Sequence, residues 1–340
     1  MGKRVGALVA SVAVACSALC AVPGVAAASS MPRFGPNVIV FTATMSQAAI
    51  QTKLNEIATQ QVPDQFGQQR YAVFFAPGTY GSAADPLIFQ VGYYTQVSGL
   101  GAHPGDVVVN GAIDVFNQCP PSPGPCEGLA NFWRSVSNLT LNVSLPKSPP
   151  TYVPDNGENA ACRNSNEMWA VSQAAPMRRV IMNGTVTLQD YCNQGFVSGG
   201  FFADDEFNGG VVINAGQQQF FTRNSNVDSW TNSVWNQVFL GDNGAPTADF
   251  GKTNQYTVLP TTPLSQSEPF LYTDPTGDYN VFVPAVQHNS VGPSYAGGAE
   301  AGRSIPIRRF FIANPSTPVW AINAALAFGR NLILTPGVYD

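Results

Sequence analysis

The chain has 340 residues, enough for one large domain or two ordinary ones. Hydrophobic residues make up 44% of it and charged residues only 11%, less than half of the roughly 25% that is usual in soluble domains. The formal net charge is -5 and no basic run is present, which argues against nucleic acid and anionic membranes as partners, because both need clustered Lys and Arg.

The N-terminal residues have the pattern of a secretory signal peptide. Lys3 and Arg4 form a charged start, residues 5–22 are mainly apolar, and a run of small residues ends just before Ser29. A retained membrane anchor is the alternative, but Ser and Cys interrupt the apolar stretch, which leads directly into the cleavage pattern. We therefore expect residues 1–28 to be removed and the protein to be secreted.

Four cysteines follow the predicted signal peptide. An even number in an exported chain indicates two disulfides, and the short loop CPPSPGPC favours Cys119 with Cys126, which leaves Cys162 with Cys192. Four cysteines permit three pairings, so this one is an expectation. The close C-x-x-C spacing of zinc sites is absent, and we expect no metal.

Short β-rich runs dominate the chain from residue 37 to residue 240. One amphipathic helix comes first, with Ile50, Leu54 and Ile57 at helical spacing behind Ser46, which is placed to cap it. The runs that follow recur about every 20 residues without two-residue hairpin turns, a pattern that favours a right-handed, single-stranded parallel β-helix like that of pectate lyases. A β-sandwich or jelly roll is the competing fold, but a solenoid needs a cap on its open end, which the helix would provide.

Prolines interrupt the next segment, residues 241–318, which we interpret as a long linker that carries one hairpin, PFLYTD-PTGD-YNVFVPA. From residue 319 to residue 340 the chain repeats itself. Ile322 and Leu326 match Ile50 and Leu54, and LILTPGVYD matches VFFAPGTYG at residues 73–81. These matches predict an internal duplication in which residues 319–340 begin a second, truncated β-helix.

Candidate catalytic carboxylates are concentrated in FFADDEFNGG. Paired carboxylates divide the work of acid and base in glycoside hydrolysis, and they also bind Ca²⁺. In a strand Asp204 and Glu206 would point one way and Asp205 the other, so Asp204 and Glu206 are the candidate pair. A solvated turn is the non-catalytic alternative.

Candidate substrate-binding residues follow in QQQFFTRNSNVDSW. Amides beside aromatic rings suit the hydroxyls and the C–H face of a pyranose. The candidates are Gln217, Gln218, Gln219, Phe220, Arg223, Trp230 and Trp235. A ladder of amides stacked inside a solenoid, with the aromatic rings in its core, explains the same residues equally well.

The runs SGGFFADDEFNGG and QQQFFTRN resemble the first β-helix of the family 55 glycoside hydrolases, and FWRSVSNLTL, WAVSQAAPMRRV and the hairpin are similar to other secreted β-helix proteins. The resemblance implies two tandem β-helices with a glucan-binding cleft between them and an inverting exo-attack on β-1,3-glucan without a cofactor. It also implies that Gln217, Gln218 and Gln219 position substrate or the attacking water, and that the general-acid glutamate belongs to a second β-helix beyond this chain.

Three functions stay open at this point. The first is a secreted β-glucan hydrolase, incomplete in this chain, and the second is a non-catalytic glycan-binding or cell-surface protein. The third is a polysaccharide lyase, for which Arg178, Arg179 and Arg223 could serve an acidic sugar. In each case we expect a monomer whose partner is a polysaccharide.

Overall fold

The structure is a computed structural model that describes residues 32–119, 126–144, 166–190, 195–248 and 255–340. All of these residues belong to one compact unit, Met31–Asp340. The predicted signal peptide, Cys162 and Cys192 lie outside the described residues. No helix within the described ranges is both long and apolar enough to cross a membrane.

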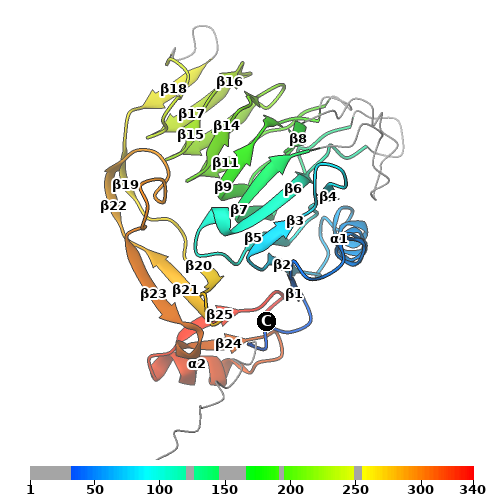
Figure 1. Cartoon of the computed structure of the whole chain (residues 1–340), viewed down its shortest axis with the longest axis vertical. Helices are drawn as coiled ribbons and strands as arrows, with labels where there is room; N and C mark the ends of the chain where they lie inside the picture. The colour runs from blue at the N-terminus through cyan, green and yellow to red at the C-terminus, as the bar shows by residue number, and fades with distance from the viewer. Residues whose placement is uncertain (1–31, 120–125, 145–165, 191–194, 249–254) are drawn as a thin grey trace, which may run out of the picture. The chain divides into compact units, whose positions relative to one another are not determined.

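Parallel strands stacked coil on coil form the body of the molecule (Figure 1). The longest face runs in the order β1 (Val38–Phe41), β2 (Tyr71–Phe75), β5 (Thr95–Gly99), β7 (Arg134–Val143), β9 (Pro176–Asn183), β11 (Phe201–Ala203), β14 (Gln219–Arg223), β17 (Asn236–Leu240) and β18 (Tyr256–Leu259). Its neighbours in this order are paired in parallel.

Shorter strands complete the coils. The long sheet also includes β3 (Gly78–Tyr80), β4 (Leu87–Gln90), β6 (Val107–Asp114), β12 (Glu206–Asn208) and β15 (Asn226–Val227). A separate parallel sheet contains β8 (Asn166–Met168), β10 (Thr185–Thr187), β13 (Val212–Ile213) and β16 (Trp230–Thr231). Parallel pairing between successive coils is the feature that separates a β-helix from a sandwich, and the predicted parallel β-helix is confirmed.

The core follows from strand alternation, which sends every second side chain to the inside. Val73, Val97, Val136, Met177 and Phe202 occupy one register position in five successive coils, and all are buried. Their neighbours along each strand point outward. The sheet therefore has an apolar inner face and an outer face that is free to form a binding surface.

The predicted capping helix is α1 (Gln47–Gln61). The Ser46 hydroxyl accepts a hydrogen bond from the Ala49 amide at 3.3 Å, as an N-cap residue should. Ile50, Leu54 and Ile57 are buried in the main core cluster. α1 therefore covers the first coils with its apolar side (Figure 1).

A column of left-handed residues marks one bend of the coils. Asn138, Arg179, Asp204 and Asn224 have φ between 52° and 58° and follow one another in register through β7, β9, β11 and β14. A residue in this conformation interrupts the strand, so the inward–outward alternation restarts after it. The side chains of the column thereby leave the coil and become available to other segments.

The segment after β18 runs back along the stack toward the first coils (Figure 1). It contains the antiparallel pair β19 (Thr262–Ser265) and β22 (Gln287–Ser290), and the antiparallel sheet of β20 (Phe270–Thr273), β21 (Tyr279–Pro284) and β23 (Gly302–Pro306). The Thr273 amide donates a hydrogen bond to the Leu100 carbonyl, and Tyr279 packs against Phe34 and Leu100. This segment therefore reaches from the last coil to the first.

The described chain ends with a strand–helix–strand unit. β24 (Phe310–Ala313) pairs in parallel with β25 (Asn331–Leu334), and α2 (Val319–Ala327) connects them. A short 3₁₀ helix, Ile307–Arg309, precedes the unit, and another, Pro104–Asp106, precedes β6.

Candidate active-site cleft

A cleft of about 1600 Å³ lies between the outer face of the long sheet and the returning segment. Its floor comes from β2, β5, β7, β9, β11, β14 and β17, and its opposite wall from β20, β21, β23, α2 and β25. Concave surfaces with mixed aromatic and polar lining are where ligands bind in most proteins. The cleft is therefore the candidate functional site.

One outward row of residues crosses the floor from coil to coil. In register order it consists of Ala72, Gln96, Ser135, Pro176, Phe201, Phe221 and Val238. Its polar residues, Gln96 and Ser135, belong to early coils, and its aromatic residues, Phe201 and Phe221, belong to later ones. The Phe201 and Phe221 rings stack on each other with centroids 5.0 Å apart, so they present their edges to the cleft.

Small residues form a hollow beside this row. Gly199 and Gly200 line the cleft and have φ of 103° and 131°, a backbone conformation that residues other than glycine rarely adopt. A Cβ at Gly200 would also lie within 2.3 Å of the Phe220 ring. The amides of Gln173 and Gln219 line the same part of the cleft. They offer uncharged donors and acceptors over a floor that a ligand can approach closely.

The charged groups of the cleft are mostly arginines. Glu268 is the one carboxylate among the described residues that line it. Its Oε1 lies 3.5 Å from Arg178 Nε, and the Arg178 guanidinium lies 4.8 Å from the centre of the Phe201 ring. Arg178 thus joins the floor of the cleft to the returning segment that carries Glu268.

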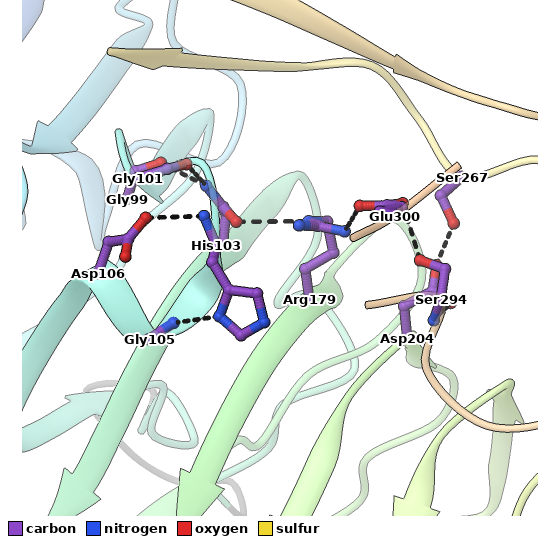
Figure 2. A network of polar contacts seen from close by, with 11 residues as sticks. Gly99, Gly101, His103, Gly105, Asp106, Arg179, Asp204, Ser267, Ser294 and Glu300 are labelled. Atoms are coloured by element: carbon purple, nitrogen blue, oxygen red, sulfur yellow. Dashed lines mark hydrogen bonds and ion pairs between the residues drawn. The ribbon is translucent and has the colours of Figure 1, made fainter. Parts of the chain in front are cut away.

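The predicted catalytic carboxylates Asp204 and Glu206 do not line the cleft, and neither does Asp205 between them. Asp204 is buried in the left-handed bend, where it accepts hydrogen bonds from the Ser267 hydroxyl and from the Ser294 amide, the latter at 3.3 Å (Figure 2). Asp205 is buried among backbone amides and accepts from Val180 at 2.7 Å and from Ala203 at 3.0 Å. Glu206 is half-buried on β12.

Burial dominates the electrostatics of both aspartates. It raises the pKa of Asp204, although the hydrogen bonds from Ser267 and Ser294 oppose the shift. It raises the pKa of Asp205 further, because that carboxylate lies wholly inside the coil. The expected pairing of Asp204 with Glu206 on one strand face is not formed, because the left-handed Asp204 breaks the alternation on which it depended.

A buried polar network fixes the returning segment to the bend (Figure 2). Arg179 Nη1 lies 2.5 Å from Glu300 Oε2, and both side chains are almost fully buried. Arg179 Nε also donates to Asn138 Oδ1, and the Ser294 hydroxyl donates to Glu300 Oε1 at 2.8 Å. Removing one partner of such a pair leaves the other charge buried and unpaired. The contact therefore specifies one position for the returning segment against the coils. Because Ser267 belongs to the same network, Asp204 holds the residue next to Glu268.

The predicted glutamines are divided between interior and cleft. Gln217 is buried and donates to the Val171 carbonyl, as expected for an amide stacked inside a solenoid. Gln218 is half-buried, and Gln219 is exposed and lines the cleft. Phe220 packs in the core with its ring edge toward Phe202 and lies under the cleft floor.

The other predicted binding residues are also divided. Trp230 is buried against Phe239, whereas Trp235 is exposed but does not line the cleft. Arg223 is half-buried with its guanidinium 5.6 Å from the Phe201 ring.

Sequence reasoning missed Trp133, Phe201 and Glu268, all of which line the cleft. Phe201 precedes the acidic cluster, but Phe202 beside it is also Phe, so the sequence does not indicate which of the two rings points outward. Trp133 and Glu268 lie where no periodic pattern indicates direction.

The predicted local disulfide is confirmed: Cys119 is bonded to Cys126. Within the described ranges no group of three or more His, Cys, Asp and Glu residues could hold a metal ion.

Comparison with known proteins gives a consistent result. No protein-family model matches the chain. It is 42% identical over 307 residues to an exo-beta-1,3-glucanase of Streptomyces sp. (strain SirexAA-E / ActE), an alignment that covers 90% of this chain and 45% of that protein.

Solved structures agree. The structure of sacteLam55A from Streptomyces sp. SirexAA-E superposes with a TM-score of 0.77 at 38% identity and covers 90% of this chain and 50% of that one. A variant of the same protein in complex with glucose gives 0.76 at 39% identity, with the same coverage. The chain spans about half the length of the relatives it matches. The expected resemblance to the family 55 glycoside hydrolases is therefore confirmed: the chain is homologous to an exo-beta-1,3-glucanase and shares the fold of sacteLam55A over nine tenths of its own length.

Proposed function

We propose that this chain contributes the glucan-binding floor of a secreted glycoside hydrolase that acts on β-1,3-glucan. The observation that carries the proposal is the 42% identity to an exo-beta-1,3-glucanase along 90% of the chain. The glucose complex of sacteLam55A supports a sugar ligand for this fold. The signal-like pattern of residues 1–28 supports secretion.

The cleft chemistry supports a neutral sugar. Amides, aromatic edges and small residues dominate the floor, and they can bind hydroxyls and C–H faces without needing a charge on the ligand. Three of the five arginines that line the cleft are held by backbone carbonyls: Arg70 donates to the Gly67 and Gln69 carbonyls, Arg134 to Val91, and Arg330 to Arg308 and Phe310. Arg178 lies beside Glu268, and Arg303 is exposed. A neutral glucan fits this cleft better than the substrate of a lyase.

We propose an inverting reaction, in which one carboxylic acid protonates the leaving oxygen and a second carboxylate activates water on the opposite side of the sugar. Glu268 is the one carboxylate that the described residues bring to the cleft, and one is too few for this mechanism. Gln219 and Gln173 are placed to hold substrate or water on the floor. Turnover therefore requires an acid that the described cleft lining does not supply.

That single carboxylate favours one second candidate, a β-helix that binds glucan without cleaving it. Both candidates are tested by calorimetry, in which the 340-residue chain is titrated with laminaripentaose and with cellopentaose. Light scattering first establishes that the preparation is monomeric. Binding that prefers the β-1,3-linked oligomer supports the proposal, and equal or no binding to the two contradicts it.

Catalysis is tested on the same preparation by proton NMR of laminarin digests. Release of α-glucose would show hydrolysis with inversion, and release of β-glucose would contradict the proposed mechanism. Binding without release of sugar would assign the non-catalytic function to this chain.

A further inference from the structure

Trp133 combines three features that are rarely found together. It has a left-handed backbone with φ of 56°, it lines the cleft, and 59% of its surface is exposed. Bulky residues avoid this conformation, which costs on the order of 1–3 kcal/mol and persists only where the surroundings enforce it. An exposed indole adds the free-energy cost of apolar surface in water. The fold thus holds a large ring in the cleft despite the free-energy costs of backbone strain and of exposed apolar surface.

Buried polar side chains on both sides enforce this position. Asn131 Nδ2 donates to the Phe116 and Ala170 carbonyls at 2.9 and 2.7 Å. Arg134 Nη1 donates to the Val91 carbonyl at 2.7 Å, and both flanking residues are buried. The turn that carries Trp133 is therefore fastened to the interior two residues before the indole and directly after it.

At the equivalent position of the neighbouring coil, Tyr94 has an aromatic ring that is fully engaged by the protein. Tyr94 also has a left-handed backbone, with φ of 55°, and its amide donates to the Trp133 carbonyl. The Arg70 guanidinium lies 3.5 Å from the centre of its ring, and its hydroxyl donates to the Gln65 carbonyl. The described part of the chain supplies no such ring contact or hydrogen bond to the Trp133 side chain.

The stacked rings of Phe201 and Phe221 offer less open aromatic face than Trp133 does. Phe201 and Phe221 cover each other, with planes inclined by 18°, and Arg178 lies over Phe201. A sugar stacks on an aromatic face, and Phe201 lies between Phe221 and Arg178, while Phe221 has one of its two faces covered by Phe201. On the next coil from Trp133 stands Ala174, whose small side chain leaves space beside the indole and whose carbonyl accepts from the Arg134 amide.

We propose that Trp133 is the stacking platform of a glucan subsite and that its open face binds the C–H face of a β-linked glucose ring. The subsite rests on the proposed function and extends it. Trp133 precedes Gln173 by one coil and Gln219 by three coils. At the usual strand spacing of about 4.8 Å, three coils separate Trp133 from Gln219 by about 14 Å. A chain stacked on Trp133 can therefore extend over the hollow at Gly199 toward the Gln219 amide.

The test uses Trp133→Gly, because glycine accepts the left-handed backbone and removes only the ring. Trp133→Phe keeps a smaller aromatic face. Trp320→Ala is the matched control, since Trp320 is also largely exposed, at 73%, but does not line the cleft. Each variant of the 340-residue chain is titrated with laminaripentaose by calorimetry, and its melting temperature and tryptophan fluorescence are recorded.

We expect Trp133→Gly to raise the dissociation constant at least tenfold without lowering the melting temperature, and Trp133→Phe to lose less. Trp320→Ala should bind within twofold of the original chain. Laminaripentaose should shift the fluorescence of the original chain, and this shift should disappear in Trp133→Phe while binding is still detected. Unchanged affinity of Trp133→Gly, in a chain that binds the pentaose, overturns the subsite alone. If the original chain binds no β-1,3-linked oligomer, the proposed function fails and takes the subsite with it.

Discussion

Two strand–helix–strand units, β1–α1–β2 and β24–α2–β25, have the same local construction. In each, the last residue of the first strand pairs with the last residue of the second, Phe41 with Phe75 and Ala313 with Leu334. In each, a tyrosine follows the second strand in the phrase P-G-x-Y. The Tyr80 hydroxyl donates to the Phe41 and Ala76 carbonyls. Tyr339 donates to the equivalent Ala313 and Thr335 carbonyls, so the resemblance in sequence reflects the same hydrogen bonds.

The two units differ in burial. Ile50, Leu54 and Ile57 of α1 lie in the main core, whereas α2 has no buried residue and Leu326 is 47% exposed. The caps differ as well, because Ser46 bonds to the Ala49 amide and Pro318 makes no side-chain cap. Local sequence therefore specifies the strand–helix–strand unit and its tyrosine lock, the hydrogen bonds that the Tyr80 or Tyr339 hydroxyl donates to two backbone carbonyls. The stabilisation of each helix depends instead on what packs against it.

The largest expected effect tests this difference at the helices. Leu54→Ala should lower the free energy of unfolding by about 3–5 kcal/mol, because it opens a cavity in a close-packed core. Leu326→Ala, at the matching position of α2, should cost less than about 1 kcal/mol, because its side chain is already hydrated. Urea denaturation of both variants measures the two costs. Similar costs would contradict the difference in burial.

The sequence predicts those parts of the fold that depend on regularly spaced apolar residues or on a repeated motif. The inward rows of the coils, the Ile50–Leu54–Ile57 helix and the repeat ending at Tyr339 all depend on neighbours a few residues apart. The site is less accessible because its residues come from positions where the period breaks. Asp204 lies in a left-handed bend that turns it away from Glu206, and Glu268 reaches the cleft only because a distant segment returns along the coils.

The second prediction concerns the pH dependence of stability, which should differ between the β-helix coils and the C-terminal β24–α2–β25 unit. Burial raises the pKa of Asp242 from 3.8 to about 7, although its oxygens accept from the Ser225 and Leu240 amides. Because the folded pKa is raised, the stabilisation from the protonated form is fully present below pH 3.8 and is lost as the pH rises through about 7. The loss should be about 2 kcal/mol once relaxation is allowed for.

Asp242→Asn provides the measurement, because an amide cannot ionise. Between pH 4 and pH 8 the free energy of unfolding of the original chain should fall more steeply than that of the variant. Hydrogen exchange, corrected for its intrinsic pH dependence, should show the loosening at β14 and β17. It should be absent from β24 and β25, since residues 310–334 contain no Asp or Glu. Parallel pH profiles of the two proteins would remove Asp242 from this account.

The smallest expected effect tests what the two units share. Tyr80→Phe should cost about 1–2 kcal/mol, because Tyr80 is buried and burial has raised its pKa to about 12. Tyr339→Phe breaks the equivalent bonds at a half-buried position, where water can replace the hydroxyl, and should cost less than about 0.5 kcal/mol. Hydrogen exchange of the Ala76 and Thr335 amides, which bond to the Phe41 and Ala313 carbonyls, reports each lock directly. If exchange accelerates at both amides while global stability falls only in Tyr80→Phe, then the lock is local in each unit and its contribution to stability depends on burial.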